Sequence, residues 1–141
     1  MANLSKRNLL IAGGAALVLA GIGFKISASG SSSSVEFKYM SVAEMQENGG
    51  LIVDIRTPQE WVDTGVIDGA KLVTFQDPQS FLAQIGPDLS DDQDLILICR
   101  SGNRSGAAAK ILDGKIPNHI ISVDGGMKRE ITEGYQTVAP K

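Results

Sequence analysis

The sequence predicts an α/β domain with a mainly parallel central sheet flanked by helices. Along residues 35–141, short runs of strand-forming residues alternate with stretches that carry helix-start signals, and this alternation is typical of parallel sheets. Two of the runs, Leu51–Ile55 and Leu95–Ile98, are almost wholly apolar. Strands that are covered by helices on both faces have this composition.

The first elements follow from local patterns. Val35–Tyr39 alternates apolar and polar residues, as a strand does. Ser41 and Glu44 have the spacing of a capping box, which predicts a short helix that ends near Asn48–Gly50. The strand Leu51–Ile55 comes next.

A second helix start follows that strand. Thr57 is suited to cap the helix, Pro58 to occupy its first position, and Glu60 to complete another capping box. Further along the chain, Lys71–Phe75 is an expected strand and Pro78–Ile85 an expected helix.

The last elements surround the loop that carries most of the chemistry. Leu95–Ile98 predicts a buried strand, and an Ala-rich stretch predicts a helix from near Ser105 to Asp113–Gly114. Ile120–Val123 is the last expected strand, and a final helix is expected after Gly125–Gly126.

The composition limits the classes of site that the chain can build. With 43% hydrophobic and 21% charged residues in 141, it is an ordinary globular chain whose length suits one folded domain. The single cysteine excludes an intramolecular disulfide and a cysteine-based zinc site, and the single histidine excludes a histidine-centred metal cluster. We therefore expect no metal, and the mechanism implied by the resemblance below requires no organic cofactor.

Residues 1–26 predict a signal anchor or a signal peptide. Lys6 and Arg7 precede the uncharged run Leu9–Phe24, a charge order that keeps the N-terminus in the cytoplasm and sends the following chain across the membrane. The small residues Ser27–Gly30 suit a cleavage site. The domain is therefore expected on the periplasmic side of the inner membrane if the segment stays attached, or soluble in the periplasm after cleavage.

A flexible linker, residues 27–34, is expected between this segment and the domain, because it is rich in Ser and Gly. In the domain itself, residues 35–141, ten Lys and Arg face all sixteen acidic residues of the chain, a net charge of −6. An acidic surface argues against nucleic acid as a partner. Contact with a membrane is expected only through the N-terminal segment.

The only cysteine of the chain, Cys99, lies between the expected strand and the expected Ala-rich helix. The N–H groups of such a turn, the helix dipole and nearby arginines favour the thiolate and an anionic ligand. Alone at a strand end, a cysteine is most often a small buried apolar residue. The residues that follow it favour a reactive thiol in an anion-binding loop: Arg100, Ser101, Gly102, Asn103, Arg104 and Ser105.

Asp54 and Arg56 lie at the end of the second expected strand, so they are expected at the carboxyl edge of the sheet near Cys99. They could form the rim of the Cys99 pocket. Alternatively, Arg56 could form a structural ion pair with Glu60 that fixes the loop. His119 is expected to be a surface residue.

Three motifs, in this order, resemble the rhodanese-like sulfurtransferase family over nearly all of residues 35–141. The central motif is the Cys99–Ser105 loop, and the other two are Val53–Trp61 with Gly65–Ala70 upstream and Val123–Met127 with Gly134–Tyr135 downstream. Three positions depart from the family pattern. Val66 stands where many members have His, Asp68 where many have Pro, and Glu130 where Trp is common.

This resemblance implies a rhodanese-like fold and a sulfurtransferase. Cys99 would take the outer sulfur of a donor such as thiosulfate as a persulfide and pass it to cyanide or a thiol. The loop amides, Arg100 and Arg104 would stabilise the negative charge.

Three alternatives stay open. A dual-specificity-type phosphatase is disfavoured, because its loop has five residues between Cys and Arg whereas four separate Cys99 from Arg104. A membrane-tethered persulfide carrier or anion-binding module would keep Cys99 but depend on a partner protein as sulfur acceptor. A thiol redox sensor is weakened by the lack of a resolving cysteine.

Overall fold

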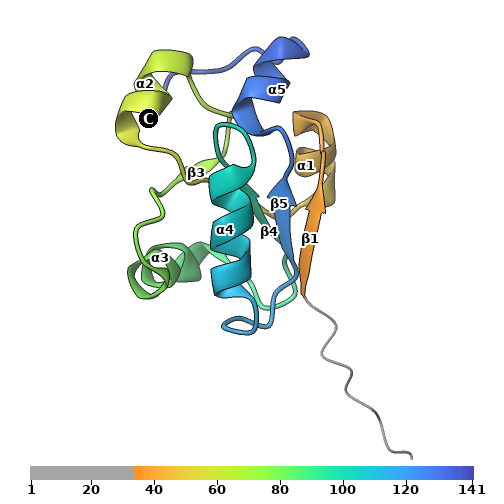
Figure 1. Ribbon diagram of the computed structural model, residues 1–141, viewed down its shortest axis with the longest axis vertical. Coiled ribbons are helices and arrows are strands. Elements are labelled where there is room, and N and C mark those ends of the chain that lie inside the picture. Colours follow the sequence, from red (N-terminus) through yellow and green to blue (C-terminus); the bar gives the residue numbers. More distant parts are fainter. Residues whose placement is uncertain (1–33) are drawn as a thin grey trace, which may run out of the picture. The chain divides into compact units, whose positions relative to one another are not determined.

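The computed structural model describes residues 34–141, which form a five-stranded sheet with strand order β1-β5-β4-β2-β3 (Figure 1). Every strand pairing in this sheet is parallel, as the sequence predicts. The expected N-terminal signal or anchor (residues 1–26) and all but the last residue of the expected linker lie outside the described residues. The strands are β1 (Val35–Lys38), β2 (Leu51–Asp54), β3 (Lys71–Leu72), β4 (Leu95–Ile98) and β5 (Ile120–Val123).

Within residues 34–141, five α-helices connect and cover these strands. A short 3₁₀ helix, η1 (Gly86–Asp88), directly follows the third α-helix. None of the helices within residues 34–141 has the length and apolar character that crossing a membrane requires. The α-helices are α1 (Val42–Asn48), α2 (Pro58–Thr64), α3 (Pro78–Ile85), α4 (Asn103–Leu112) and α5 (Gly126–Thr132).

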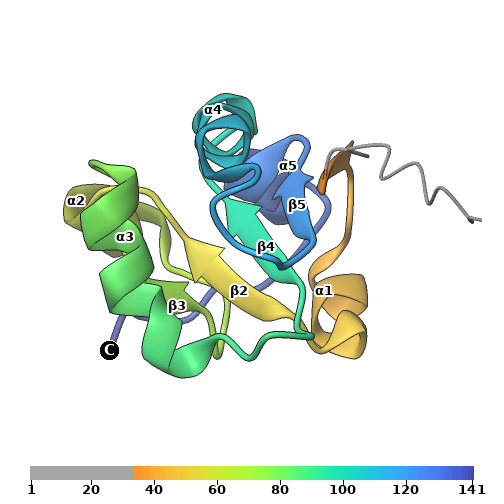
Figure 2. The same cartoon turned by 90° about the horizontal axis from the view of Figure 1, so that it is seen from below.

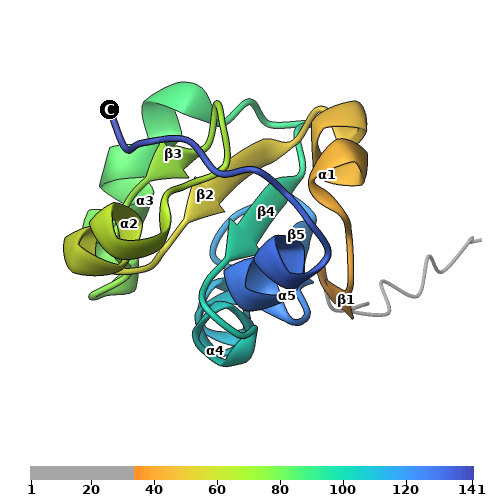
Figure 3. The same cartoon turned by 90° about the horizontal axis from the view of Figure 1, so that it is seen from above.

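The sheet separates two apolar clusters. Alternate side chains of a strand belong to one cluster or the other. In β4, Leu95 and Leu97 pack with residues of α3 and α4, whereas Ile96 and Ile98 pack with residues of α1 and α5. Figures 2 and 3 show α4 and α1 on opposite sides of the sheet. Because successive side chains of a strand point to opposite faces, Cys99 continues the series of Leu95 and Leu97 toward the face that α4 covers.

Helix caps fix where the first two helices begin. Ser41 with Glu44, and Thr57 with Glu60, each form a complete capping box at the start of α1 and α2, as their spacing predicts. The second of these boxes leaves the Glu60 carboxylate beside the carboxyl edge of the sheet. Its oxygens accept hydrogen bonds there from the Thr57 N–H and hydroxyl groups and from a further residue described below.

The first two strands each end one residue earlier than the sequence predicts, and two further boundaries differ by more. The third strand is only Lys71–Leu72, rather than reaching Phe75. Val73 and Phe75 still donate their N–H groups to the carbonyls of Asp54 and Ile55, so this segment follows β2 beyond the regular ladder. Helix α4 begins two residues before Ser105, because Gly102 adopts a left-handed conformation (φ 96°) that turns the chain into the helix at once.

Candidate active site

The Cys99 loop lies at the edge of the sheet toward which the parallel strands point, where α2 and α5 also lie (Figure 1). The strand β4 ends at Ile98, and α4 begins at Asn103, so only four residues form the turn. Arg100, Ser101 and Asn103 are exposed, whereas the Cys99 side chain and Ser105 are buried. The loop thus encloses the sulfur and presents its polar side chains outward.

Hydrogen-bond donors surround the Cys99 sulfur. The Gly102 N–H group donates to Sγ across 3.1 Å, and the Ser105 hydroxyl lies 3.5 Å from Sγ. Burial raises the pKa of the Cys99 thiol, but hydrogen bonds from the Ser105 hydroxyl and from the N–H groups of Ser105, Ser101 and Gly102 outweigh it, so the pKa lies below its usual value. A thiol with a lowered pKa has more of its population as the nucleophilic thiolate.

A second serine extends this network, and sequence reasoning missed it. The Ser122 hydroxyl of β5 donates to Ser105 Oγ at 2.9 Å, and both side chains are fully buried. Ser105 Oγ also lies 3.1 Å from the Gly102 carbonyl, so its own proton has two competing acceptors, that carbonyl and Sγ. The signal in the sequence is a lone serine within the apolar strand Ile120–Val123.

The loop carbonyls are turned toward the start of α5. Met127 and Lys128 donate their N–H groups to the carbonyls of Cys99 and Arg100 at 2.8 and 2.9 Å. This approach requires Gly126, because a Cβ there would lie 2.4 Å from the Cys99 carbonyl oxygen. The paired glycines therefore let the N–H groups at the start of α5 bond to the outward-facing carbonyls of the loop. The N–H groups of the loop itself can then turn inward to the sulfur.

Asp54 and Arg56 form a buried ion pair beside the loop. Arg56 Nε and Nη2 bond to the Asp54 carboxylate at 2.7–3.0 Å, and the remaining N–H groups of Arg56 bond to Thr64 Oγ1 and to the carbonyls of Glu60 and Gly65. All five guanidinium N–H groups are thus taken, and they tie α2 to the end of β2. The alternative that Arg56 forms an ion pair with Glu60 is wrong, because the Arg56 guanidinium pairs with Asp54.

The Glu60 carboxylate instead binds Arg104, at the start of α4. Arg104 Nη2 and Nη1 donate to the two Glu60 oxygens at 2.6 and 2.8 Å. The hydrogen bond from Arg104, aided by those from Thr57, lowers the pKa of Glu60 to about 2, so this side chain is ionised at neutral pH. Arg104, which the sequence predicts as an anion-binding group, is therefore already paired in the resting protein.

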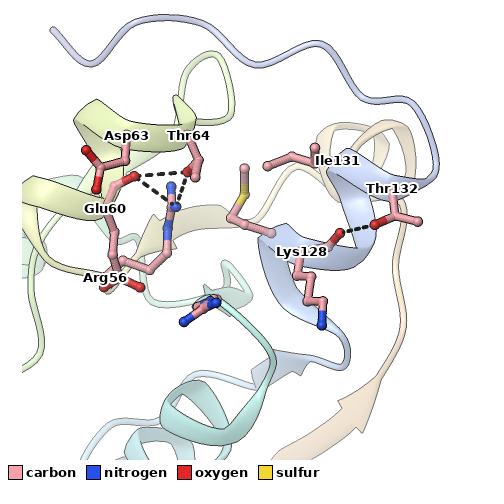
Figure 4. Close-up of a pocket in the computed structure, with 9 residues that line it drawn as sticks. Arg56, Glu60, Asp63, Thr64, Lys128, Ile131 and Thr132 are labelled. Atoms are coloured by element: carbon pink, nitrogen blue, oxygen red, sulfur yellow. Dashed lines mark hydrogen bonds between the residues drawn. The ribbon is translucent and has the colours of Figure 1, made fainter.

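A cavity of about 470 Å³ lies beside the loop, between α2 and α5 (Figure 4). Arg100, one residue beyond Cys99, lines the cavity, whereas Cys99 itself does not. The residues that line the cavity are Arg56, Glu60, Asp63, Thr64, Arg100, Met127, Lys128, Ile131 and Thr132.

None of the three positions that depart from the family pattern lines this cavity. Val66 exchanges two backbone hydrogen bonds with Val138, and the Asp68 N–H donates to the Tyr135 hydroxyl, so both tie the C-terminal segment to the domain. The buried Glu130 accepts a hydrogen bond from the Val42 N–H, and burial raises its pKa. The exposed His119 precedes β5, at the opposite edge of the sheet from Cys99.

Comparison with known proteins adds the chemistry of relatives. A family model for the rhodanese-like domain matches residues 40–129. The chain is 36% identical over 96 residues to the thiosulfate sulfurtransferase GlpE of Ectopseudomonas mendocina, a match covering 66% of this chain and 84% of that protein. It is 32% identical over 91 residues to a sulfurtransferase of Allochromatium vinosum, covering 64% of this chain and 80% of the relative.

Solved structures agree with this match. A rhodanese-related protein from Thermoplasma volcanium superposes with a TM-score of 0.55 and 31% sequence identity, covering 73% of this chain and 99% of that one. A protein of unknown function from Rhodopseudomonas palustris, described as a possible tyrosine phosphatase, superposes with a TM-score of 0.58 and 25% identity, covering 72% and 85% of the two chains. The chain therefore belongs to the rhodanese-like domain family and is a sulfurtransferase of the rhodanese type.

Proposed function

We propose that this enzyme moves sulfane sulfur from a donor such as thiosulfate to a thiophilic acceptor, cyanide or a thiol, through a persulfide on Cys99. The observation that carries the proposal is the set of hydrogen-bond donors around Sγ, which lowers the pKa of the thiol at the carboxyl edge of the sheet. The name of the relatives, thiosulfate sulfurtransferase, supports thiosulfate as the donor.

In the first half-reaction, the Cys99 thiolate attacks the outer sulfur of thiosulfate. A bond forms between Sγ and that sulfur, the S–S bond of thiosulfate breaks, and sulfite leaves with the bonding electron pair. The persulfide anion that remains carries one negative charge. N–H groups such as that of Gly102, which already point at Sγ, are placed to stabilise this anion.

In the second half-reaction, the acceptor attacks the outer sulfur of the persulfide. The bond between that sulfur and Sγ breaks, and its electron pair returns to Sγ as the thiolate. Cyanide gains the sulfur and becomes thiocyanate, whereas a thiolate acceptor gains it and becomes a persulfide. No net oxidation occurs, so the cycle needs no redox partner or cofactor.

The loop side chains are proposed to bind the anionic donor. The Arg100 guanidinium is exposed and has no side-chain partner within residues 34–141, so it is free to meet thiosulfate. Arg104 contributes a positive charge whose position Glu60 fixes. Ser101, Gly102, Asn103 and Ser105 supply the remaining N–H and hydroxyl groups of the loop, and Asp54 with Arg56 supports it from β2.

Intact-mass spectrometry of the full chain tests the persulfide. After treatment with thiosulfate, the protein is expected to gain the mass of one sulfur atom, and cyanide is expected to remove it. Cys99→Ser is the control and is expected to show no gain, because it keeps the size of the side chain without the nucleophilic thiolate. A sulfur that Cys99→Ser still acquires would place the reaction elsewhere, and a wild-type chain that acquires none would reject thiosulfate as donor.

We also propose that residues 1–26 export the domain and either anchor it on the periplasmic side of the inner membrane or leave it soluble there after cleavage. The support is the order of charged, apolar and small residues in the sequence. Membrane fractionation, with the N-terminal mass of the mature chain, separates the two outcomes. A full-length chain in the cytoplasmic fraction would contradict both.

A persulfide carrier that serves a partner protein is the alternative function. It predicts a Cys99 persulfide that forms but resists both cyanide and small thiols. The same mass measurement therefore distinguishes the carrier from the enzyme with free turnover.

A further inference from the structure

The cavity between α2 and α5 is much larger than thiosulfate or cyanide. It encloses about 470 Å³, whereas a five-atom anion occupies on the order of 100 Å³, a few times the roughly 30 Å³ of one water. A volume of this size is in the range of sites for organic ligands. Arg100, the residue that follows the proposed nucleophile, lines the cavity, so a ligand bound in it lies beside the Cys99 loop.

Several polar groups in the cavity wall already have partners inside the protein. All five N–H groups of Arg56 are bonded, and the Glu60 carboxylate holds Arg104. Thr64 Oγ1 and Thr132 Oγ1 each donate to the carbonyl of the residue four positions earlier in the chain. These groups shape the wall, but most of their hydrogen-bonding capacity is already used within the protein.

Two cations in the wall remain without an anion. Within residues 34–141, no carboxylate bonds to the guanidinium of Arg100 or to the ammonium of Lys128, although the domain as a whole is acidic. Both belong to segments held by backbone bonds, because the Lys128 N–H donates to the Arg100 carbonyl at 2.9 Å. A ligand with a carboxylate would supply an anion for one of these two cations.

The same wall has an apolar part. Met127 and Ile131 of α5 line the cavity, and Ile131 is 40% exposed. Figure 4 shows Ile131 projecting from α5 toward α2, where Asp63 and Thr64 form the opposite wall. Met127 is already buried, so a short aliphatic chain would remove the exposed surface of Ile131 from water. The Asp63 carboxylate, which accepts a hydrogen bond from Gln59, makes the α2 side unfavourable for an anion.

We propose that this cavity is the acceptor site and that it selects a small organic thiol that carries a carboxylate. The aliphatic part lies along Met127 and Ile131, the carboxylate pairs with Lys128, and the sulfur reaches past Arg100 to the Cys99 persulfide. The proposal rests on the persulfide function above. In the step, the acceptor thiolate bonds to the outer sulfur, the bond from that sulfur to Sγ breaks, and the electron pair stays on Sγ.

Single-turnover kinetics of the full chain test the selection. The enzyme is loaded with thiosulfate, freed of small molecules and mixed with 3-mercaptopropionate or with the neutral 2-mercaptoethanol, while loss of the persulfide is followed by mass. Lys128→Gln is expected to lower the ratio of the two rates about three- to fivefold, the effect of one partly exposed charge pair. Comparing ratios between variants cancels the different intrinsic reactivities of the two thiols.

Two matched variants test whether the charge at position 128 causes the change in the ratio of the two rates. Lys128→Arg keeps the charge and is expected to keep the ratio, whereas Asp63→Asn removes the opposing anion and is expected to raise it. A ratio that Lys128→Gln leaves unchanged would overturn the proposal even though the persulfide forms. Failure of the loading step is seen separately, before any thiol is added, and counts against the persulfide function.

A binding measurement on the resting enzyme tests the site without turnover. Titration with 3-mercaptopropionate, followed by protein NMR, is expected to shift the signals of Lys128 and Ile131, and the same concentration of 2-mercaptoethanol is expected to shift them less. Lys128→Gln is expected to abolish this difference. Equal shifts with the two thiols in the wild-type enzyme would contradict the proposed carboxylate site.

Discussion

The Glu60 carboxylate and the Arg104 guanidinium form a two-pronged ion pair, with oxygen–nitrogen distances of 2.6 and 2.8 Å. It joins the first turn of α2 to the first turn of α4, next to the proposed nucleophile. The same carboxylate completes the capping box of α2 with Thr57. One side chain thus positions a helix start and restrains an arginine that an anionic donor would otherwise meet unpaired.

Glu60→Gln is expected to lower the KM for thiosulfate several-fold. The substitution removes a negative charge near the loop and frees the planar fork of Arg104 for an anion. Steady-state kinetics with cyanide as acceptor measure the change. An unchanged KM would show that Arg104 does not meet the donor.

Glu44→Gln is the matched control for that experiment. Glu44 occupies the corresponding capping position of α1 and bonds to Ser41, but it holds no arginine. Glutamine can replace glutamate in a capping box, so both variants keep the cap. Only the change at position 60 is expected to alter the KM.

The same ion pair predicts how stability depends on pH. The folded-state pKa of Glu60 is about 2, below the ~4.3 of an unfolded glutamate, so its contribution is present above pH ~4.3 and is lost as the pH falls toward 2. Because the Arg104 side chain is 45% exposed, solvent screening limits this contribution to about 1 kcal/mol. Denaturant unfolding of wild type and Glu60→Gln from pH 7 to 3 measures it. Their difference in unfolding free energy is expected to shrink below pH ~4.5, and a difference that grows there would contradict the assignment.

Ser122→Ala is expected to raise the pKa of the Cys99 thiol, because it removes a neutral hydrogen bond that acts on the sulfur through Ser105. The Ser122 hydroxyl donates to Ser105 Oγ and thereby favours donation by Ser105 to the sulfur. Loss of this bond leaves less thiolate at a given pH. Absorbance at 240 nm against pH measures the thiolate.

The pH–rate profile of sulfur transfer is expected to move in the same direction, so that activity lost by Ser122→Ala near neutral pH returns at higher pH. Ser105→Ala, which removes the direct donor, is the reference and is expected to give a larger rise in pKa. A purely structural role for Ser122 would lower activity at every pH without moving the profile.

Local patterns in the sequence predicted the order of the strands and helices and the starts of α1 and α2. This succeeded because capping boxes and dense apolar runs depend on residues a few positions apart. The position of Cys99 between a strand and a helix was predicted for the same reason. Of the loop residues 100–105, Gly102 and Ser105 contact the sulfur, whereas Arg100, Ser101, Asn103 and Arg104 are exposed.

Contacts between distant residues were not predictable in this way. Glu60 and Arg104 are 44 positions apart, and either could have met another charged side chain. Ser122 reaches Ser105 only because β5 lies beside β4 in the sheet. Arg56 was assigned to the wrong carboxylate, because sequence spacing gives no information about which side chain turns inward from the strand end.

Gly126 brings the start of α5 against the Cys99 loop. A Cβ at this position would lie 2.4 Å from the Cys99 carbonyl oxygen and 2.7 Å from the Arg100 carbonyl carbon. Neither backbone atom can move without displacing the loop. Gly126→Ala is therefore expected to lower the unfolding free energy by about 3 kcal/mol, from the clash together with a positive φ of 55°. It is also expected to remove most sulfur transfer, since the N–H groups around Sγ depend on that contact.

Gly114→Ala is a control that separates the two effects expected at Gly126, the clash of a Cβ with the loop and the strain of a positive φ. Gly114 also has a positive φ, of 74°, but a Cβ there would meet no atom within 4 Å. This variant is expected to lose only about 1 kcal/mol and to keep its activity. Denaturant unfolding and thiosulfate turnover of the two variants, measured side by side, test the difference. Equal losses would mean that the left-handed backbone alone requires glycine at position 126 and that the close approach to the loop contributes nothing.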